Sequence, residues 1–589
     1  MRKSDDRKAK NFSSSFKRLL KNLKPYTIPI VIASVFSILS TALAIFGPDL
    51  LSKIVDEIQA GLTSSINFDV LVQYCINIGV LALICIICEL IQGFILVSTS
   101  HNFCRSLRRD VSKKINRLPL KFFDRKPVGD TMSVITNDID NIYDGLQQGV
   151  SNLTYAIATL VGVLFMMFKT NWIMSLTSVI ATLLGFVIVT IIATKSKKYF
   201  KAQQKNIGEL NGYIEEMYSC YNVVKTYNGV DDARKEFKVL NEKLAKSAQK
   251  ASFLGGVIPP IMSFVGSFGY VAVCIVGALL TMNNVIGFGT IIAFIFYVRL
   301  FSNPLNTIAQ SFTRMQSVVA AADRVFDFMD ETEMPSEEHI TQYLDKKSVK
   351  GNISFENVCF AYDTKPVINN FSIDVKSGQK VAIVGHTGAG KTTLVNLLMK
   401  FYDISSGDIK IDGISIKDLS RSNVHELFCM VLQQTWLFNG TVRENIVYNQ
   451  ENINEADVKR ACDMAGIAEF IESLPNEYET ILDESNNLSE GQKQLLTIAR
   501  AIISSSPFII LDEATSSVDR KTELLVQESM DKLMDGRTSF IIAHRLSTIQ
   551  NADIILVLDH GDIVETGSHE ELIEKDGVYA NLYNSQFSI

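Results

Sequence analysis

The sequence GHTGAGKT, which runs from Gly385 to Thr392, has the residue types of a phosphate-binding loop. It follows the apolar run VAIV and precedes the apolar stretch LVNLLMKF, so it lies between an expected strand and an expected helix, as such a loop requires. Glycines allow backbone N–H groups to wrap around phosphate oxygens, and the helix N-terminus adds a favourable dipole. Lys391 is expected to reach the β- and γ-phosphates, and Thr392 to offer its hydroxyl to Mg²⁺. The loop therefore predicts binding of a nucleoside triphosphate.

A second apolar run ends in two carboxylates. In FIILDEAT, Asp512 closes the run where its carboxylate can hold Mg²⁺ or the waters of the ion, and Glu513 follows directly. A general base that activates water must be a carboxylate or an imidazole within reach of that water. The pair thus has the chemistry for metal-assisted hydrolysis of the bound triphosphate.

The segment LSEGQ, from Leu488 to Gln492, precedes the run that ends in Asp512. The chain thus has three motifs in a fixed order: a phosphate-binding loop, LSEGQ, and a strand that ends in Asp-Glu. This ordered set resembles the nucleotide-binding domain of ATP-binding cassette (ABC) transporters. The resemblance implies that Glu513 orients and deprotonates the attacking water, and that His544, in IIAHR, contacts the γ-phosphate.

The same resemblance assigns further contacts to the nucleotide. Gln433, in VLQQTWLF, corresponds to the glutamine that senses Mg²⁺ and couples to the membrane helices, and Tyr362, in CFAYD, to the aromatic residue that stacks on adenine. The segment SSVD (516–519) corresponds to the D-loop between two ATPase domains. The expected ATP contacts are Tyr362, Gly385, His386, Thr387, Gly388, Ala389, Gly390, Lys391, Thr392, Thr393 and Gln433. The expected catalytic residues are Glu513, His544 and Lys391, and the expected Mg²⁺ ligands are Thr392, Gln433 and Asp512.

In the family, the signature segment LSEGQ opens a helix whose amides face the ATP held by the other subunit. The residues expected to face that ATP are Ser489, Glu490, Gly491 and Gln492. Since one chain carries one phosphate loop and one signature, a complete ATP site requires a second chain, and the resemblance implies a half-transporter that dimerises.

Glu490 departs from the family pattern, which usually has glycine at this position. Its carboxylate adds like-charge repulsion near a triphosphate. Upstream, Leu482-Asp483 stands where the family usually has Gly-Glu. An altered signature together with an intact Glu513 resembles one subunit of the bacterial heterodimeric multidrug exporters. We therefore favour a heterodimer, and a homodimer that tolerates Glu490 is the alternative.

The chain is long enough for more than one domain, with 589 residues and a net charge of −6 that does not indicate nucleic-acid binding. Upstream of about residue 310 the sequence is dominated by apolar runs, and downstream it has the mixed texture of an α/β domain. Among nine scattered cysteines, Cys85 and Cys88 form a C-x-x-C pattern inside an apolar run. We expect them to be small side chains on one membrane helix rather than a redox or metal pair.

Six apolar runs each approach the length needed to cross about 30 Å of hydrocarbon. We place the spans at 26–48, 74–100, 150–168, 172–194, 256–281 and 285–308, after a basic segment at 1–25. The two long connections, 101–149 and 195–255, are rich in Lys and Arg. The positive-inside bias therefore predicts that both long segments, both termini and the ATPase domain are cytoplasmic.

The two long connections also resemble the intracellular loops of ABC exporters of the six-span, type IV architecture. That resemblance implies that their tips dock on ATPase domains, and we expect 131–142 and 225–236 to transmit motion to the spans. Glu89 and Arg299 are ionisable residues inside apolar spans, where charge is costly. A role in substrate binding or gating and a purely structural role both remain open for them.

These features predict a multidomain chain. An all-α transmembrane domain of six helices (26–329) is followed by a linker (330–350) and an α/β P-loop ATPase domain (351–589). The resemblance implies an ATP- and Mg²⁺-dependent exporter of an amphipathic drug, lipid or peptide, which works with a second half-transporter chain in a bacterial plasma membrane. An ATP-gated channel or sensor and a lipid flippase of the same architecture are the alternatives.

Overall fold

The computed structural model describes residues 12–61, 66–283, 285–433, 435–482, 488–512, 519–542 and 549–587. The chain divides into two compact units, which we call the membrane unit (Met1–Asn116 and Pro127–Glu331) and the ATPase unit (Arg117–Lys126 and Thr332–Ile589). Glu513 and His544, together with Asp483 and the first three residues of the SSVD segment, lie outside the described residues.

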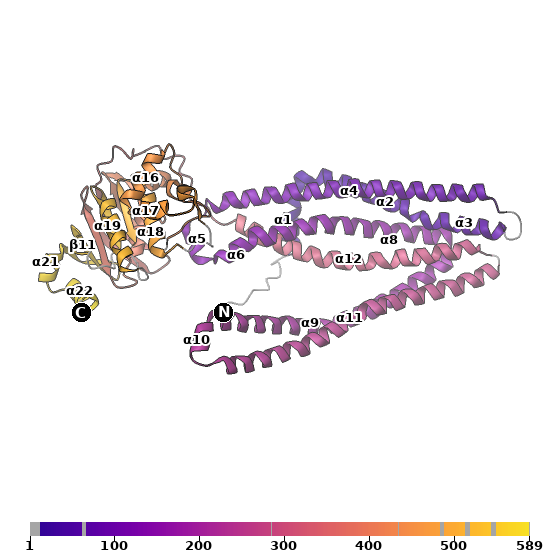
Figure 1. Ribbon diagram of the computed structural model, residues 1–589. Coiled ribbons are helices and arrows are strands. Elements are labelled where there is room, and N and C mark those ends of the chain that lie inside the picture. The colour runs from indigo at the N-terminus through magenta and orange to yellow at the C-terminus, as the bar shows by residue number, and fades with distance from the viewer. Residues whose placement is uncertain are drawn as a thin grey trace. The chain divides into compact units, whose positions relative to one another are not determined.

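The membrane unit consists of helices, several of which are far longer than a bilayer requires (Figure 1). It opens with α1 (Phe12–Asn22), η1 (Lys24–Tyr26), α2 (Thr27–Ile45), α3 (Gly47–Gly61) and α4 (Phe68–Ile115). The first long loop (101–149) continues with α6 (Val128–Ser133), the π-helical η2 (Val134–Asp138), α7 (Ile139–Asp144) and the π-helical η3 (Gly145–Gly149). The remaining helices are α8 (Val150–Thr170), α9 (Trp172–Ser219), α10 (Tyr221–Thr226), α11 (Val230–Met282) and α12 (Phe288–Met329).

The predicted helical transmembrane domain is confirmed, with roughly six apolar helices. Within the described residues, five helical stretches are long and apolar enough to cross a membrane, and a shorter apolar stretch, Gly266–Met282, ends α11. The tight turn expected between the third and fourth spans is the single residue Asn171, whose side-chain oxygen caps α9 by accepting hydrogen bonds from Ile173 N and Met174 N at 3.0 and 3.1 Å. This cap lets α9 begin directly after α8, because it satisfies amides that a helix start leaves unpaired.

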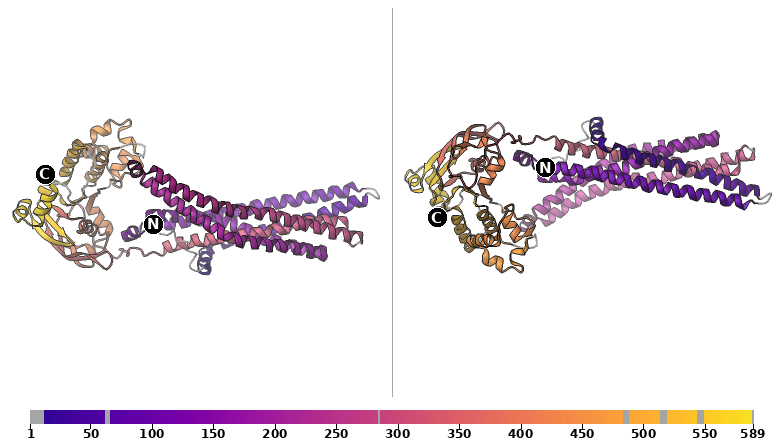
Figure 2. Two further views of the ribbon diagram at one scale, coloured as in Figure 1. Left: turned by 90° about the horizontal axis from the view of Figure 1, so that it is seen from below. Right: turned by 90° about the horizontal axis from the view of Figure 1, so that it is seen from above.

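The second long loop (195–255) is part of a helical hairpin. Helices α9 and α11 lie side by side along much of their length and are joined by the short α10, as both views in Figure 2 show. Asn206 of α9 donates to the Lys243 carbonyl oxygen at 3.2 Å and to Ser247 Oγ at 2.9 Å on α11, which holds the two helices in register. This hairpin contains the Lys- and Arg-rich connection 195–255.

The ATPase unit contains two main sheets. An antiparallel sheet has the order β2-β1-β4-β5, from strands β1 (Ile353–Ala361), β2 (Pro366–Val375), β4 (Ser406–Ile411) and β5 (Ile414–Ser415). A six-stranded sheet has the order β12-β11-β3-β10-β9-β6, from β3 (Lys380–Gly385), β6 (Phe428–Val431), β9 (Phe508–Asp512), β10 (Thr538–Ile542), β11 (Ile554–Asp559) and β12 (Asp562–Gly567). The short β7 (Gly440–Thr441) and β8 (Ile481–Leu482) pair with each other.

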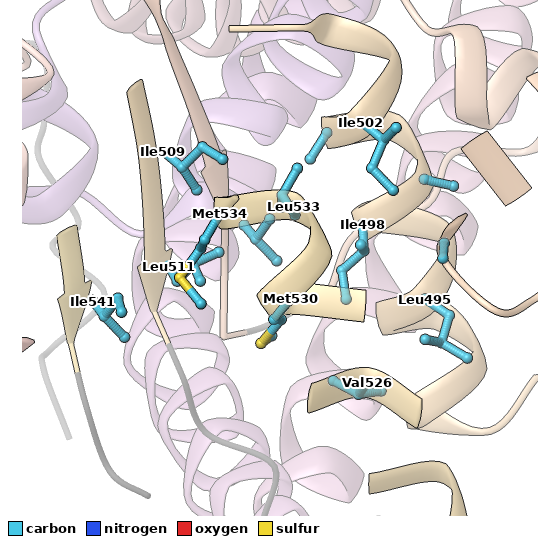
Figure 3. Packing of buried hydrophobic residues seen from close by; sticks show 14 of the residues in the cluster. Leu495, Ile498, Ile502, Ile509, Leu511, Val526, Met530, Leu533, Met534 and Ile541 are labelled. Atoms are coloured by element: carbon cyan, nitrogen blue, oxygen red, sulfur yellow. The ribbon is translucent and has the colours of Figure 1, made fainter. Parts of the chain in front are cut away.

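Helices cover this larger sheet and complete the predicted α/β fold. They are α13 (Lys391–Leu398), α14 (Arg421–Leu427), α15 (Val442–Val447), α16 (Glu455–Met464), α17 (Ala468–Glu472), α18 (Glu490–Ser504), α19 (Arg520–Met534), α21 (His569–Glu574) and α22 (Val578–Phe587), with η4 (Ile416–Asp418) and η5 (Glu477–Glu479). Figure 3 shows Leu495, Ile498 and Ile502 of α18 beside the labelled residues of α19 and β9. Their spacing places them on one face of α18, so the helix that follows LSEGQ is anchored by the core.

A short piece of the first long loop belongs to the ATPase unit. Residues Arg117–Lys126, which include α5 (Leu120–Arg125), cluster with the ATPase residues, whereas 131–142 lies in the membrane unit. There the buried Asp138 of η2 accepts a hydrogen bond from Arg324 Nε of α12 at 2.9 Å. The part of this loop that clusters with the ATPase residues is therefore 117–126, which lies earlier in the chain than the 131–142 stretch that we expected.

Candidate ATP-binding site

The phosphate loop connects β3 to α13, as the sequence predicts. Gly388 and Gly390 have φ values of +89° and +106°, in a region that other residues rarely adopt. A Cβ at Gly390 would also lie 2.9 Å from the Ile368 side chain. These two positions therefore require glycine, and they turn the loop tightly into the first turn of α13.

The predicted loop residues differ in exposure. His386, Thr387, Gly388 and Thr392 are exposed, Ala389, Gly390 and Thr393 are buried, and Gly385 and Lys391 are intermediate. The exposed stretch precedes the N-terminus of α13, where unpaired amides favour an anion. The loop thus presents backbone N–H groups and side chains to a ligand while its base is held in the core.

Lys391 lies over the loop. Its Nζ donates hydrogen bonds to the carbonyl oxygens of Gly385 at 2.6 Å and His386 at 3.3 Å. Burial lowers the pKa of Lys391, and the nearby charge of Asp512 acts in the opposite direction. A half-buried ammonium whose protein partners are neutral carbonyls is well suited to an anionic ligand, so the residues present fit a triphosphate.

The sheet topology brings the loop and the expected metal ligands to one edge. Strand β10 lies between β3 and β9 and is parallel to both, and β6 is parallel to β9. The phosphate loop follows β3, Asp512 is the last residue of β9, and Gln433 follows β6. Because the carboxyl ends of parallel strands meet at the same edge of a sheet, these groups lie on the same side as the loop.

Tyr362 lies close to the loop helix. Its hydroxyl is 3.1 Å from Thr393 Oγ1, and its ring packs edge-on against Phe360 and Tyr402, with centroid distances of 4.9 and 5.0 Å. The structure therefore brings together Tyr362 and the phosphate loop, which are distant in the sequence.

The signature segment caps α18. Ser489 Oγ accepts from Gln492 N at 3.2 Å, and the Gln492 side chain accepts from Ser489 N at 2.9 Å, which is a capping box. Glu490 is exposed in the first turn and its Oε1 lies 2.8 Å from Lys493 Nζ. Gly491 is buried. The carboxylate of Glu490 thus has a cationic neighbour on its own helix, which sequence reasoning did not consider.

The sequence analysis also missed a contact that ties the signature helix to the segment after Gln433. Arg500 of α18 donates from Nε to the Asn445 carbonyl at 2.8 Å and from Nη1 to the Trp436 carbonyl at 3.3 Å. Its guanidinium carbon lies 5.2 Å from the ring centroid of Tyr448, which is within the range of a cation–π contact. An arginine in an amphipathic helix gives no signal of such a role.

The short helix α5 also contacts residues beside the site, which the sequence did not indicate. Lys121 Nζ donates to the Tyr362 carbonyl at 2.9 Å and lies 3.5 Å from Asp363 Oδ1. The hydroxyl of Tyr402 donates to the Asp124 carboxylate, and Arg125 pairs with Asp363. The segment therefore contacts the backbone of the residue expected to bind adenine.

Comparison with known proteins agrees with this architecture. Residues 30–305 match the family of the ABC transporter transmembrane region, and residues 368–516 match the ABC transporter family. A fatty acid ABC transporter ATP-binding/permease protein of Mycobacterium bovis is 44% identical over 475 residues, covering 80% of this chain and 75% of that protein.

Two other relatives match nearly the whole chain. The ABC transporter ATP-binding protein YfiC of Bacillus subtilis is 37% identical, covering 98% of this chain and 95% of that protein. An ATP-dependent lipid A-core flippase of Syntrophus aciditrophicus is 33% identical, covering 97% and 94%. Half-transporters of the ABC family act as dimers in a lipid bilayer, and their ATPase activity is coupled to transport. With its multi-pass membrane region and its ATP-binding region in one polypeptide, this chain belongs to the ABC transporters as a half-transporter.

Proposed function

We propose that this chain is one half of an exporter that moves an amphipathic substrate out of the cytoplasm when two ATPase domains bind and hydrolyse ATP. The observation that carries the proposal is the phosphate loop, with Lys391 Nζ 2.6 Å from the Gly385 carbonyl, in one chain with helices long enough to cross a membrane. The basic segments 101–149 and 195–255 support a cytoplasmic ATPase unit. The bacterial relatives support a bacterial plasma membrane.

We propose the following residues as those that would hold MgATP, and the geometry of the loop supports this proposal. The amides around Gly388 and the Lys391 ammonium would bind the phosphates, and Tyr362 would bind adenine. Thr392, Gln433 and Asp512 would hold Mg²⁺, which supplies positive charge toward the phosphate oxygens when bound. We propose Glu513 as the base that orients the attacking water, and His544 as the contact to the γ-phosphate.

The second chain completes the ATP sites. We propose that Ser489, Glu490, Gly491 and Gln492 face the ATP on the partner's loop, and that this chain's own loop receives the partner's signature. A carboxylate at Glu490, which is exposed at the start of α18, weakens the site offered to the partner. The ion pair with Lys493 reduces that repulsion without removing it, because both side chains are partly exposed to screening solvent. We therefore favour a heterodimer in which this chain's loop is the hydrolytic one.

Coupling to the membrane helices would pass through the first cytoplasmic loop. Helix α5 contacts the Tyr362 carbonyl, Asp363 and Tyr402. A rearrangement near the adenine would therefore be transmitted directly to that loop. The 225–236 stretch of the second loop, which includes exposed residues at the start of α11, remains the candidate for contact with the partner.

A lipid flippase is the second candidate, and the similarity to the lipid A-core flippase and the fatty acid transporter favours it over a channel. It shares the ATP chemistry and differs in whether the cargo is released from the bilayer. Movement of a labelled lipid between leaflets, with no release to the aqueous phase, would support the flippase.

Transport into sealed inverted vesicles tests the proposal. We expect accumulation of a fluorescent amphiphile that requires ATP and is lost in Glu513→Gln, because the amide is not a base. Glu528→Gln, the same change in an exposed pair on α19, is the matched control and is expected to transport normally. Accumulation that persists in Glu513→Gln would contradict the pump and favour an ATP-gated channel.

A further inference from the structure

A polar cavity lies within the membrane unit, between α2, α4 and α8. It has a volume of about 240 Å³. The residues that define its chemistry are Ser40 and Thr41 of α2, Glu89 and Gln92 of α4, and Ser151 and Tyr155 of α8. Each of these helices contains or belongs to an apolar stretch long enough to cross a membrane, so the convergence of polar side chains from three of them at one place is unusual.

Hydrogen bonds fix the position of these side chains. The buried Ser40 donates from Oγ to Glu89 Oε1 at 3.3 Å. The buried Gln92 donates from Nε2 to Ser151 Oγ at 2.7 Å, which joins α4 to α8. These bonds connect α2 to α4 and α4 to α8, and Glu89 itself is exposed at the opening of the cavity.

Glu89 sets the charge of the cavity. Among the described residues that line it, Glu89 is the one acidic or basic side chain. Ser40 gives its carboxylate one hydrogen bond, and an ionised carboxylate has about four acceptor positions. In the part of the chain that the structure describes, Glu89 forms no ion pair, and Arg299 on α12 lies outside the cavity. The carboxylate thus keeps acceptor capacity for a cation that comes from outside the chain.

The size of the cavity restricts what that cation can be. A pocket for a whole drug-sized ligand occupies about 300–1,000 Å³, so 240 Å³ suits the polar end of an amphiphile. It is also much larger than one inorganic cation needs, because Na⁺ or Mg²⁺ is held by close oxygen ligands. Tyr155 adds an aromatic ring to the wall, and such rings attract ammonium groups.

We propose that this cavity binds the ammonium headgroup of a cationic amphiphile, with Glu89 as the residue that selects its charge. The inference rests on the proposed export function and names the class of substrate. A fatty acid anion would bring a second carboxylate toward Glu89 and is disfavoured by repulsion. This chain is thus expected to prefer a cationic substrate, unlike the relative that is named as a fatty acid transporter.

The test uses the dimeric transporter reconstituted in vesicles, with probe-stimulated ATPase activity as the readout. The probes are an alkyltrimethylammonium ion, the neutral alcohol and the fatty acid anion, all of one chain length. We expect the cation to stimulate at the lowest concentration, and Glu89→Gln to raise its half-saturating concentration about tenfold. Stimulation by the neutral alcohol is expected to be unchanged in Glu89→Gln. This unchanged response also serves as evidence that the variant is folded.

Two variants provide the controls. Glu89→Asp keeps the charge and is expected to retain most of the preference for the cation. Glu57→Gln makes the same chemical change on α3, outside the cavity lining, and is expected to behave as the unaltered protein.

Three results would overturn the inference: no preference for the cation in the unaltered transporter, the same preference in Glu89→Gln, or a stimulation by Na⁺ alone that Glu89→Gln abolishes. Failure of every probe to be transported with ATP would instead contradict the proposed function.

Discussion

The hydroxyl of Tyr402 offers a precise test of how α5, the loop segment within the ATPase unit, is held against the rest of that unit. This hydroxyl donates to the carboxylate of Asp124 on α5, while the ring packs edge-on against Phe360 and Tyr362 at 5.6 and 5.0 Å. Burial, followed by the hydrogen bond to Asp124, raises the pKa of Tyr402, so the hydroxyl keeps its proton throughout the physiological range. Tyr402→Phe therefore removes the donor and leaves the aromatic packing in place.

The magnitude follows from the kind of bond that is lost. A hydrogen bond to a charged group contributes about 1.5–3 kcal/mol, and the exposure of Asp124 places this bond at the lower limit. We expect docking of α5 to weaken by about 1.5 kcal/mol, which is roughly tenfold in its equilibrium. Lys121 and Arg125 still hold Tyr362 and Asp363, so the segment is expected to dock less tightly rather than to detach.

The assay is the ratio of substrate transported to ATP hydrolysed by the reconstituted dimer. Tyr402→Phe is expected to retain ATPase activity, because the chemistry of the phosphate loop is untouched, and to transport less substrate per ATP hydrolysed, because α5 docks less tightly. Asp124→Asn, alone and with Tyr402→Phe, completes a double-mutant cycle, for which we expect a coupling energy of about 1.5 kcal/mol. An unchanged transport ratio, or strictly additive effects of the two substitutions, would refute the reasoning.

Further predictions concern the linker and the signature. Glu337 is largely buried and pairs with Lys400 at 3.1 Å and with Arg421 at 2.6 Å. Glu337→Ala is therefore expected to lower the free energy of unfolding of the ATPase unit by about 3 kcal/mol. Glu338→Ala, at the exposed neighbouring residue, is expected to change it little. Thermal unfolding compares the two variants, and equal effects would contradict the buried network. Burial opposes ionisation of Glu337, but hydrogen bonds from Arg421 and Lys400 and their charges outweigh it and lower its pKa below the usual 4.5. Its stabilising contribution is therefore complete above pH 4.5 and is lost as the pH falls through the lower folded value, which unfolding of Glu337→Gln against pH would test. Glu490→Gly removes a carboxylate from the first turn of α18 and is expected to tighten ATP binding at the partner's loop about fivefold, corresponding to roughly 1 kcal/mol. Nucleotide retention measures this effect, and unchanged retention would indicate that Lys493 already neutralises Glu490.

The parts of the fold that could be predicted are those encoded locally. The apolar runs predicted the spans because a membrane helix needs only length and hydrophobicity, and Asn171 gave the turn between two of them. The strand–loop–helix setting of Lys391 likewise follows from adjacent residues. Their placement in the structure agrees with the sequence pattern.

The contacts that escaped prediction join residues far apart in the chain. Nothing in the sequence around Asp124 identifies Tyr402 as its partner, so we expected the loop to act through 131–142. The two π-helical segments in that loop depend on tertiary packing, as in the ion pair between Asp138 and Arg324, and leave no periodic signal. The cavity at Glu89 is equally hidden, because it requires three helices to meet.

The most direct test of the account is the rate of ATP hydrolysis by the purified dimer when Lys391→Ala is present in this chain alone. The phosphate loop of this chain is proposed to be the hydrolytic one, and Lys391 is the cation that lies over it. We predict that hydrolysis falls to the background rate although the partner's loop is intact. Retention of half or more of the activity would show that the partner's loop hydrolyses ATP as well, and would contradict the asymmetric site.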